Sequence, residues 1–131
     1  MTQKEFTDFI IPKMIDKFPQ FAQLCTSKSD DITDIDNKSN KGKLTFSVTT
    51  QDKEITLGFT GDTDCDWHTH MSLFEANTPD EELEAANKFI SDIIFDKKKI
   101  IHSSIHGYYP TDKNVTSDKS EIVEIFKWSD L

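Results

Sequence analysis

The chain has 131 residues, of which 24 are Asp or Glu and 15 are Lys, and its formal charge is −9 at pH 7. A surface of this sign repels phosphate groups and anionic lipids, so direct binding to nucleic acid or to a membrane surface is disfavoured. The chain contains no Arg. Arg is the residue whose planar guanidinium holds phosphates through paired hydrogen bonds, and its absence argues against phosphoryl transfer.

Hydrophobic residues make up 35% of the chain and ten residues are Phe, which is enough for the core of a single domain over residues 1–131. No stretch reaches the roughly 18 apolar residues of a membrane span, so we expect no membrane insertion. The N-terminal residues lack the basic start and apolar run of a signal peptide, and Cys25 and Cys65 are too few for a disulfide framework. These features predict a cytoplasmic protein.

The first predicted element is a helix that begins after Thr2. Thr2 and Glu5 have the spacing of a capping box, and apolar residues then recur at helical intervals as far as Phe18. Pro12 falls inside this pattern, and we expect it to kink or restart the helix because proline lacks a backbone N–H and clashes with the preceding turn. A further short helical turn is expected after Pro19.

A polar stretch follows over residues 27–43. It holds Asp30, Asp31, Asp34 and Asp36 among Ser, Asn, Lys and Gly. Because such a composition buries little apolar surface, we expect a solvated loop.

Apolar and polar residues then alternate over residues 44–48 and 55–59, and this alternation predicts two half-buried strands. A third strand is predicted over residues 66–73, with Trp67 on the core face and Asp66 and two histidines on the other. Short connections between the three strands indicate an antiparallel arrangement.

A second helix is predicted to begin at Thr78, an N-cap residue followed by Pro79 and by acidic residues in the first turn. Two more strands are predicted, over residues 101–109 and 122–128, with a polar loop over residues 110–120 between them. The element order is α-β-β-β-α-β-β. It predicts an α+β fold in which a single, mainly antiparallel sheet of about five strands packs against two helices.

One group of residues has the chemistry of a metal site. Asp66, His68 and His70 occupy alternate positions, which places all three on one face of a strand. If a strand with His102 and His106 lay beside it, the imidazoles would converge on zinc or another transition metal. No further ligand lies at a fixed spacing, so partner-lining strand residues are the favoured interpretation. A metal-binding protein or metal-dependent hydrolase is the alternative.

A nucleophilic site has less support. Cys65 lies three residues before His68, and on a continuous strand this odd separation directs the two side chains to opposite faces. The chain also lacks a glycine-rich phosphate loop and a nucleophile elbow. We therefore expect neither enzymatic activity nor a cofactor.

The carboxylates instead gather in residues 30–36, 62–66 and 80–84, with aromatic residues beside the second stretch. Interfaces depend on a few aromatic anchors, and acidic rims accelerate encounter with a basic partner. The residues predicted to bind a partner are Asp62, Asp64, Asp66, Trp67, His68 and His70, with Asp30, Asp31, Asp34 and Asp36 as a second patch.

The run from Glu54 to Phe59, the acidic turn, the sequence Trp67-His68-Thr69-His70 and the capped helix resemble small immunity proteins encoded beside bacterial polymorphic toxins, including contact-dependent growth-inhibition systems. The resemblance covers residues 54–97. It implies a cytoplasmic antitoxin that binds one cognate toxin domain, often a basic nuclease, and blocks it with an acidic surface. It implies no catalytic residue. Besides the metal protein, a small adaptor that associates with itself through a sheet edge or a helix face remains an alternative.

Overall fold

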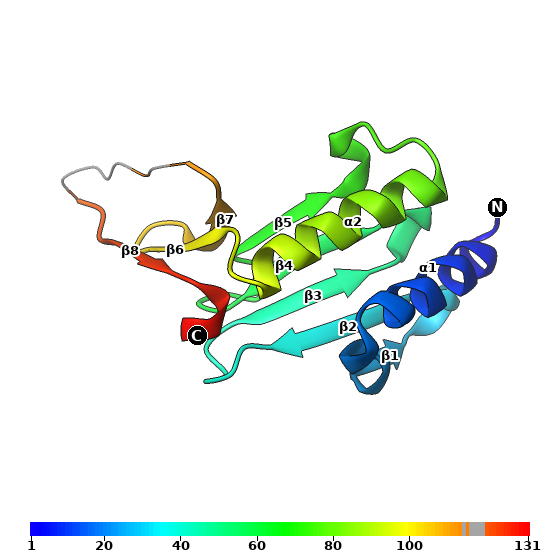
Figure 1. The fold of residues 1–131 in the computed structure, drawn as a ribbon, viewed down its shortest axis with the longest axis horizontal. Helices are drawn as coiled ribbons and strands as arrows, with labels where there is room; N and C mark the ends of the chain where they lie inside the picture. Colours follow the sequence, from blue (N-terminus) through cyan, green and yellow to red (C-terminus); the bar gives the residue numbers. More distant parts are fainter. Residues whose placement is uncertain (114, 116–119) are drawn as a thin grey trace.

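The structure, a computed structural model, describes residues 1–113, 115 and 120–131. A five-stranded antiparallel sheet carries two helices on one face, and a three-stranded sheet lies at one end of it (Figure 1). The predicted α+β class, with an antiparallel sheet packed against two helices, is confirmed. The second sheet was not predicted.

Helix α1 (Gln3–Lys17) begins where the sequence indicates. The Thr2 hydroxyl accepts a hydrogen bond from the Glu5 amide, and the Glu5 carboxylate accepts one from the Thr2 amide. The helix runs through Pro12 without interruption, so the predicted restart is wrong. Residues on both sides of the proline are anchored in the core, which holds the helix together despite the lost hydrogen bond: Phe6, Ile10 and Met14. A 3-10 helix (Pro19–Leu24) follows as expected.

The five strands of the larger sheet follow one another in chain order, and each pairs antiparallel with the next. They are β1 (Cys25–Ser27), β2 (Thr33–Lys38), β3 (Thr45–Thr49), β4 (Thr56–Thr60) and β5 (Trp67–His70).

Strand β2 lies inside the stretch that was predicted to be a loop, so that prediction is wrong for residues 33–38. The strand is mostly polar because its outer face meets solvent. Its one apolar side chain, Ile35, is fully buried and pairs with Val48 of β3, and Thr33 on the same face is buried as well. These two buried residues fix the register of the strand.

The third predicted strand is shorter than expected. Strand β5 ends at His70 and continues as a 3-10 helix (Met71–Phe74), so Met71 is buried whereas Leu73 is 71% exposed. Helix α2 (Pro79–Ile94) begins as predicted, with the Thr78 hydroxyl accepting a hydrogen bond from the Glu81 amide.

The smaller sheet has the order β7-β6-β8, formed by β6 (Lys99–Ser103), β7 (Gly107–Thr111) and β8 (Val123–Phe126). The single strand predicted over residues 101–109 is wrong, because the chain reverses between β6 and β7. Gly107 makes this reversal possible, since its φ of 73° lies in the left-handed region. Of the predicted loop over 110–120, residues 110 and 111 belong to β7, while residues 114 and 116–119 lie outside the described residues.

One hydrophobic core joins the helices to both sheets. Helices α1 and α2 cover the same face of the five-stranded sheet (Figure 1), and their apolar stripes meet a row of inward side chains from its strands. The inward sheet residues that are fully or almost fully buried are Ile35, Phe46, Val48, Leu57 and Phe59. In the part of the chain that the structure describes, no helix has both the length and the apolar character needed to cross a membrane.

Candidate functional site

The opposite face of the five-stranded sheet is uncovered. The outward residues of β2 to β5 are half-buried or exposed, and none is buried. This face is hollowed over a volume of about 380 Å³. Polar side chains from the four strands β2 to β5 and from the turn before β5 surround this open-face hollow, among them Asp34, Asp36, Ser47, Thr56, Asp64 and His68.

The floor of the hollow is set by Gly58. This residue lies in the middle of β4, paired with Ser47 on one side and His68 on the other. A Cβ atom at this position would lie 3.1 Å from the carbonyl oxygen of Trp67 and 3.5 Å from the Cβ of His68. Glycine within a strand often marks a place where another group approaches the backbone closely. Here it leaves the centre of the face without a side chain.

One side of the hollow is acidic. The Lys28 ammonium lies 2.9 Å from a carboxylate oxygen of Asp34 and neutralises it. The Ser47 hydroxyl donates a hydrogen bond of 2.7 Å to Asp36. Neither Asp36 nor Asp64 forms an ion pair with a lysine among the described residues. Two carboxylates outside any ion pair of the described residues therefore border this hollow, although the charge of Lys28 also acts on Asp36.

On the other side His68 of β5 lines the hollow, and His70, the next outward residue of the same strand, lies beside His68 but does not line the hollow. The His68 and His70 rings meet edge to face with centroids 5.3 Å apart. The Nδ1 atom of His70 lies 2.8 Å from the Thr56 hydroxyl and 3.7 Å from a carboxylate oxygen of Glu54. These contacts fix the His70 ring, while His68 stays exposed at the rim.

Cys65 and His68 lie together, contrary to the sequence prediction. The Cys65 sulfur is 3.3 Å from Nδ1 of His68. The prediction assumed that both residues belong to one strand, but β5 begins only at Trp67, so Cys65 lies in the preceding turn and the alternation of faces does not apply to it. The thiol is exposed and lines the open-face hollow.

This position makes Cys65 a chemical probe of the hollow. We expect a maleimide to label Cys65 at least about tenfold faster than Cys25, because burial raises the pKa of the Cys25 thiol and its sulfur donates to the Phe21 carbonyl. Peptide mapping by mass spectrometry after short labelling times measures both rates. Equal labelling of the two cysteines would contradict the placement of Cys65 at an open surface.

Asp66 has a structural position instead of the predicted partner-binding one. Its carboxylate accepts hydrogen bonds from the amides of Asp62 at 3.0 Å, Thr63 at 2.6 Å and Tyr108 at 2.9 Å. Burial alone would raise the pKa of Asp66, but these amide bonds outweigh it and lower the pKa below its ordinary value. The residue thus joins the β4–β5 turn of one sheet to strand β7 of the other.

Four further predicted binding residues do not direct their side chains into the hollow. The Trp67 ring stacks on Phe89 of α2, with centroids 5.6 Å apart, so it lies on the covered side of the sheet. Asp30 and Asp31 form a short 3-10 turn (Ser29–Asp31) that does not line the hollow. Asp62 also turns away from it, because its carboxylate lies 2.6 Å from Nε2 of His102.

The residues of the metal alternative are dispersed. His102 belongs to the smaller sheet, where its ring packs on Tyr108 with centroids 4.5 Å apart, and His106 lies in the turn after β6. The assumed pairing of their strand with β5 is therefore wrong. Asp66 is engaged by backbone amides and His68 by Cys65. Over residues 1–113, 115 and 120–131, no three His, Cys, Asp or Glu side chains come together as a metal site.

The sequence analysis missed several residues of the hollow, including Lys28, Ser47, Thr56 and Gly58. A signal for the last three was present, because they occupy the polar positions of the two strands predicted from alternation. A glycine inside such an alternating run also indicates a close approach.

No family model, characterised protein or solved structure matches this chain. The open-face hollow is therefore interpreted from its own residues and geometry.

Proposed function

We propose that this chain is an immunity protein that binds a basic toxin domain through the open-face hollow and neutralises it by occupying its active site or substrate groove. One observation carries the proposal. A whole face of the sheet is uncovered, lowered at Gly58 and bordered by the carboxylates of Asp36 and Asp64, neither of which forms an ion pair among the described residues. The resemblance of residues 54–97 to immunity proteins supports the same function.

The hollow suits a cationic side chain. A Lys or Arg that enters over Gly58 meets Asp36 from β2 and Asp64 from the turn before β5. Hydroxyl groups of Ser47 and Thr56 lie on its path as hydrogen-bond acceptors. The exposed His68 ring offers an edge or face to a guanidinium, which stacks well on aromatic rings.

The overall charge supports the same partner chemistry. A formal charge of −9 attracts a basic domain from a distance and raises its rate of encounter. At contact, a positively charged substrate groove would then lie against the acidic side of the hollow. Occupancy of that groove excludes the substrate, and no reaction by the chain is needed.

The proposal predicts that a secreted protein with a basic C-terminal toxin domain is encoded beside this chain, and that domain is the partner used in the test. We expect co-expression of the chain to protect cells from that domain and the two proteins to bind in calorimetry. The double variant Asp36→Asn, Asp64→Asn is expected to weaken binding by about tenfold or more, because both unpaired charges of the hollow are lost.

The matched control is Asp30→Asn, Asp31→Asn. It also removes two negative charges, but away from the hollow, and both residues have a φ of 60°, which Asn tolerates well. This control is expected to bind almost as the unmodified chain does. Equal weakening in both double variants would assign binding to net charge, and no protection by the chain would reject the immunity function.

A further inference from the structure

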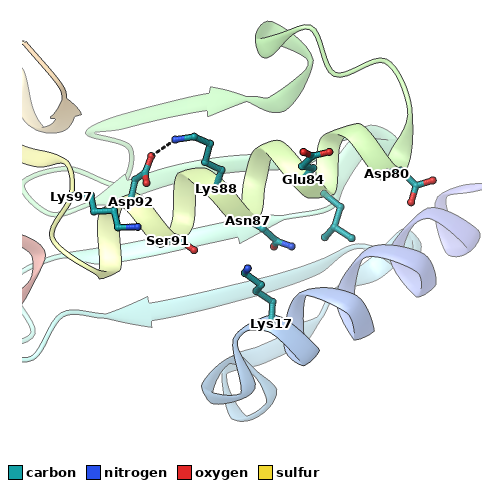
Figure 2. A pocket seen from close by; sticks show the side chains of 9 residues that line it. Lys17, Asp80, Glu84, Asn87, Lys88, Ser91, Asp92 and Lys97 are labelled. Atoms are coloured by element: carbon teal, nitrogen blue, oxygen red, sulfur yellow. Dashed lines mark hydrogen bonds and ion pairs between the residues drawn. The ribbon is translucent and has the colours of Figure 1, made fainter.

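A groove along α2 lacks the side chains that most readily act as nucleophile and base. It has a volume of about 560 Å³ and is bordered by α1, from which Lys17 extends toward Asn87 (Figure 2). The described residues that line this groove include neither cysteine nor histidine. The open-face hollow, in contrast, is lined by both Cys65 and His68. The hollow is thus the concave surface with the means for nucleophilic chemistry.

The turn before β5 holds Cys65 in a defined place at the edge of the hollow. The amide of Cys65 donates a hydrogen bond of 3.3 Å to the Thr63 hydroxyl, and the Thr60 hydroxyl donates one of 3.1 Å to the Asp64 carbonyl. The next residue, Asp66, is held by three backbone amides. The Cys65 side chain itself is exposed. The thiol is therefore both anchored and accessible to a reagent in solution.

His68 supplies a base for this thiol. Its Nδ1 atom lies 3.3 Å from the Cys65 sulfur, within reach of a hydrogen bond from the thiol. In the tautomer that carries its proton on Nε2, Nδ1 is an acceptor and can take the thiol proton. The thiolate is the nucleophilic state of cysteine. The imidazolium beside it offsets the repulsion from the carboxylate of Asp64, which lines the same hollow.

The charges around the thiol and imidazole favour one class of reagent. Asp36 and Asp64 border the hollow and form no ion pair among the described residues. Lys28, which also lines the hollow, lies 2.9 Å from a carboxylate oxygen of Asp34. Such a surface attracts a small cation and repels a small anion. Thiolates react with disulfides by attack on sulfur, so a cationic disulfide combines the favoured charge with the favoured chemistry.

We propose that Cys65 and His68 form a thiol–disulfide exchange site for small disulfides that carry positive charge. The thiol proton passes to Nδ1 of His68, and the Cys65 sulfur attacks one sulfur of the disulfide. A new S–S bond forms to Cys65 while the original S–S bond breaks. The departing thiolate takes the electron pair and recovers a proton from the imidazolium. Cys65 is oxidised and the departing half of the disulfide is reduced, so no other oxidant is needed.

This reaction goes beyond the proposed immunity function and does not depend on it, because it is measured on the chain alone. A mixed disulfide at Cys65 would also place a cation on the docking surface and weaken the binding of a basic domain. Only this consequence rests on the proposed function. Failure of the exchange reaction and failure of the immunity function are therefore separate results.

The preference for positive charge is tested with three small disulfides: cystamine is cationic, hydroxyethyl disulfide is neutral and dithiodiglycolate is anionic. Mass spectrometry with peptide mapping follows the adduct on Cys65 of the full chain at low salt, and each rate is divided by that of the neutral thiol N-acetylcysteine amide. We expect the normalised rate for cystamine to exceed that for dithiodiglycolate by about tenfold or more. In Asp36→Asn, Asp64→Asn this ratio is expected to fall by about threefold or more, whereas Asp30→Asn, Asp31→Asn keeps it.

The role of His68 is tested with the neutral disulfide across pH. At about pH 7 we expect His68→Gln to react about threefold or more slowly than the unmodified chain, because the thiol loses its proton acceptor. The two rates should converge near about pH 10, where a thiol ionises without a base. His70→Gln makes the same change on the same strand and is expected to react as the unmodified chain does, because His70 contacts Thr56 and not the thiol.

Two results would overturn the proposal. One is an equal rate for His68→Gln and the unmodified chain at about pH 7. The other is a normalised rate that does not depend on the charge of the disulfide. Thermal unfolding of each variant verifies that a slower reaction does not come from loss of the fold.

Discussion

Replacement of Asp66 with Ala is expected to lower the free energy of unfolding by about 2–4 kcal/mol, because three amide donors lose a charged acceptor at once. One of these donors, the Tyr108 amide, belongs to the other sheet, so the loss separates the β4–β5 turn from β7. Urea unfolding followed by tryptophan fluorescence measures the change. A loss below about 0.5 kcal/mol would show that the hydrogen bonds accepted by Asp66 contribute little to the stability of the fold.

Gly107 provides the matched partner for a double-mutant cycle. A Cβ atom at this position would lie 2.6 Å from a carboxylate oxygen of Asp66, and the φ of 73° is unfavourable for any residue with a side chain. Gly107→Ala is therefore expected to destabilise the fold as well. The double variant is expected to lose less than the sum of the two single changes, because the clash disappears with the carboxylate. Additive losses would argue against a direct contact.

The stability that the Asp66 carboxylate contributes also depends on pH. The folded state lowers the pKa of Asp66 below the unfolded value of about 3.9. A carboxyl group shifted in this direction stabilises the fold above its unfolded pKa, and the contribution is lost as pH falls through the folded pKa. The difference in stability between the unmodified chain and Asp66→Ala should thus shrink at pH values below about 4.

The second large effect is expected at Glu82, a carboxylate that is only 8% exposed. Its Oε1 atom accepts a hydrogen bond of 2.9 Å from the Ile55 amide and so ties the first turn of α2 to the start of β4. Glu82→Ala leaves this buried donor unpaired, and we expect a loss of about 1–3 kcal/mol in the free energy of unfolding. Glu82→Gln keeps a carbonyl acceptor and is the control.

The sign of the pH effect at Glu82 is opposite to that at Asp66. Burial raises the pKa of Glu82, and the charge of Glu54 adds to the rise, although the Ile55 amide bond acts against it. The contribution of Glu82 is therefore greatest below its unfolded pKa and declines as pH rises through the folded pKa. Glu82→Gln should be as stable as the unmodified chain or more stable at pH 7. A clear loss in this variant would show that the charge itself is needed.

Local rules were sufficient for the elements that carry strong local signals. The capping box at Thr2 and the N-cap at Thr78 fixed the starts of both helices, and alternation identified β3 and β4. Strand β2 was missed because its stability comes from pairing with β3 and from a single buried apolar side chain, Ile35. Neither feature is visible in a polar segment taken alone.

The candidate site was predicted in part. The sequence could show neither contacts between residues far apart in the chain nor the exact start of a strand. Asp36, Asp64 and His68 do border the same hollow. Asp66, however, is engaged by an amide 42 residues away in another sheet, and sequence spacing carries no information about such a partner. The pairing of Cys65 with His68 was excluded because the strand was assumed to start too early. Strand boundaries are the least certain part of a sequence pattern, and here they decide which side chains meet.

The docking surface is tested by the salt dependence of binding between this chain and the basic toxin domain that the proposed function predicts to be encoded beside it. Affinity would be measured from about 50 to 500 mM salt, where surface charges become progressively screened. For the unmodified chain and for Asp30→Asn, Asp31→Asn we expect the same steep loss of affinity, and for Asp36→Asn, Asp64→Asn a shallower one. Three identical slopes would show that the carboxylates of the open-face hollow do not form the docking surface.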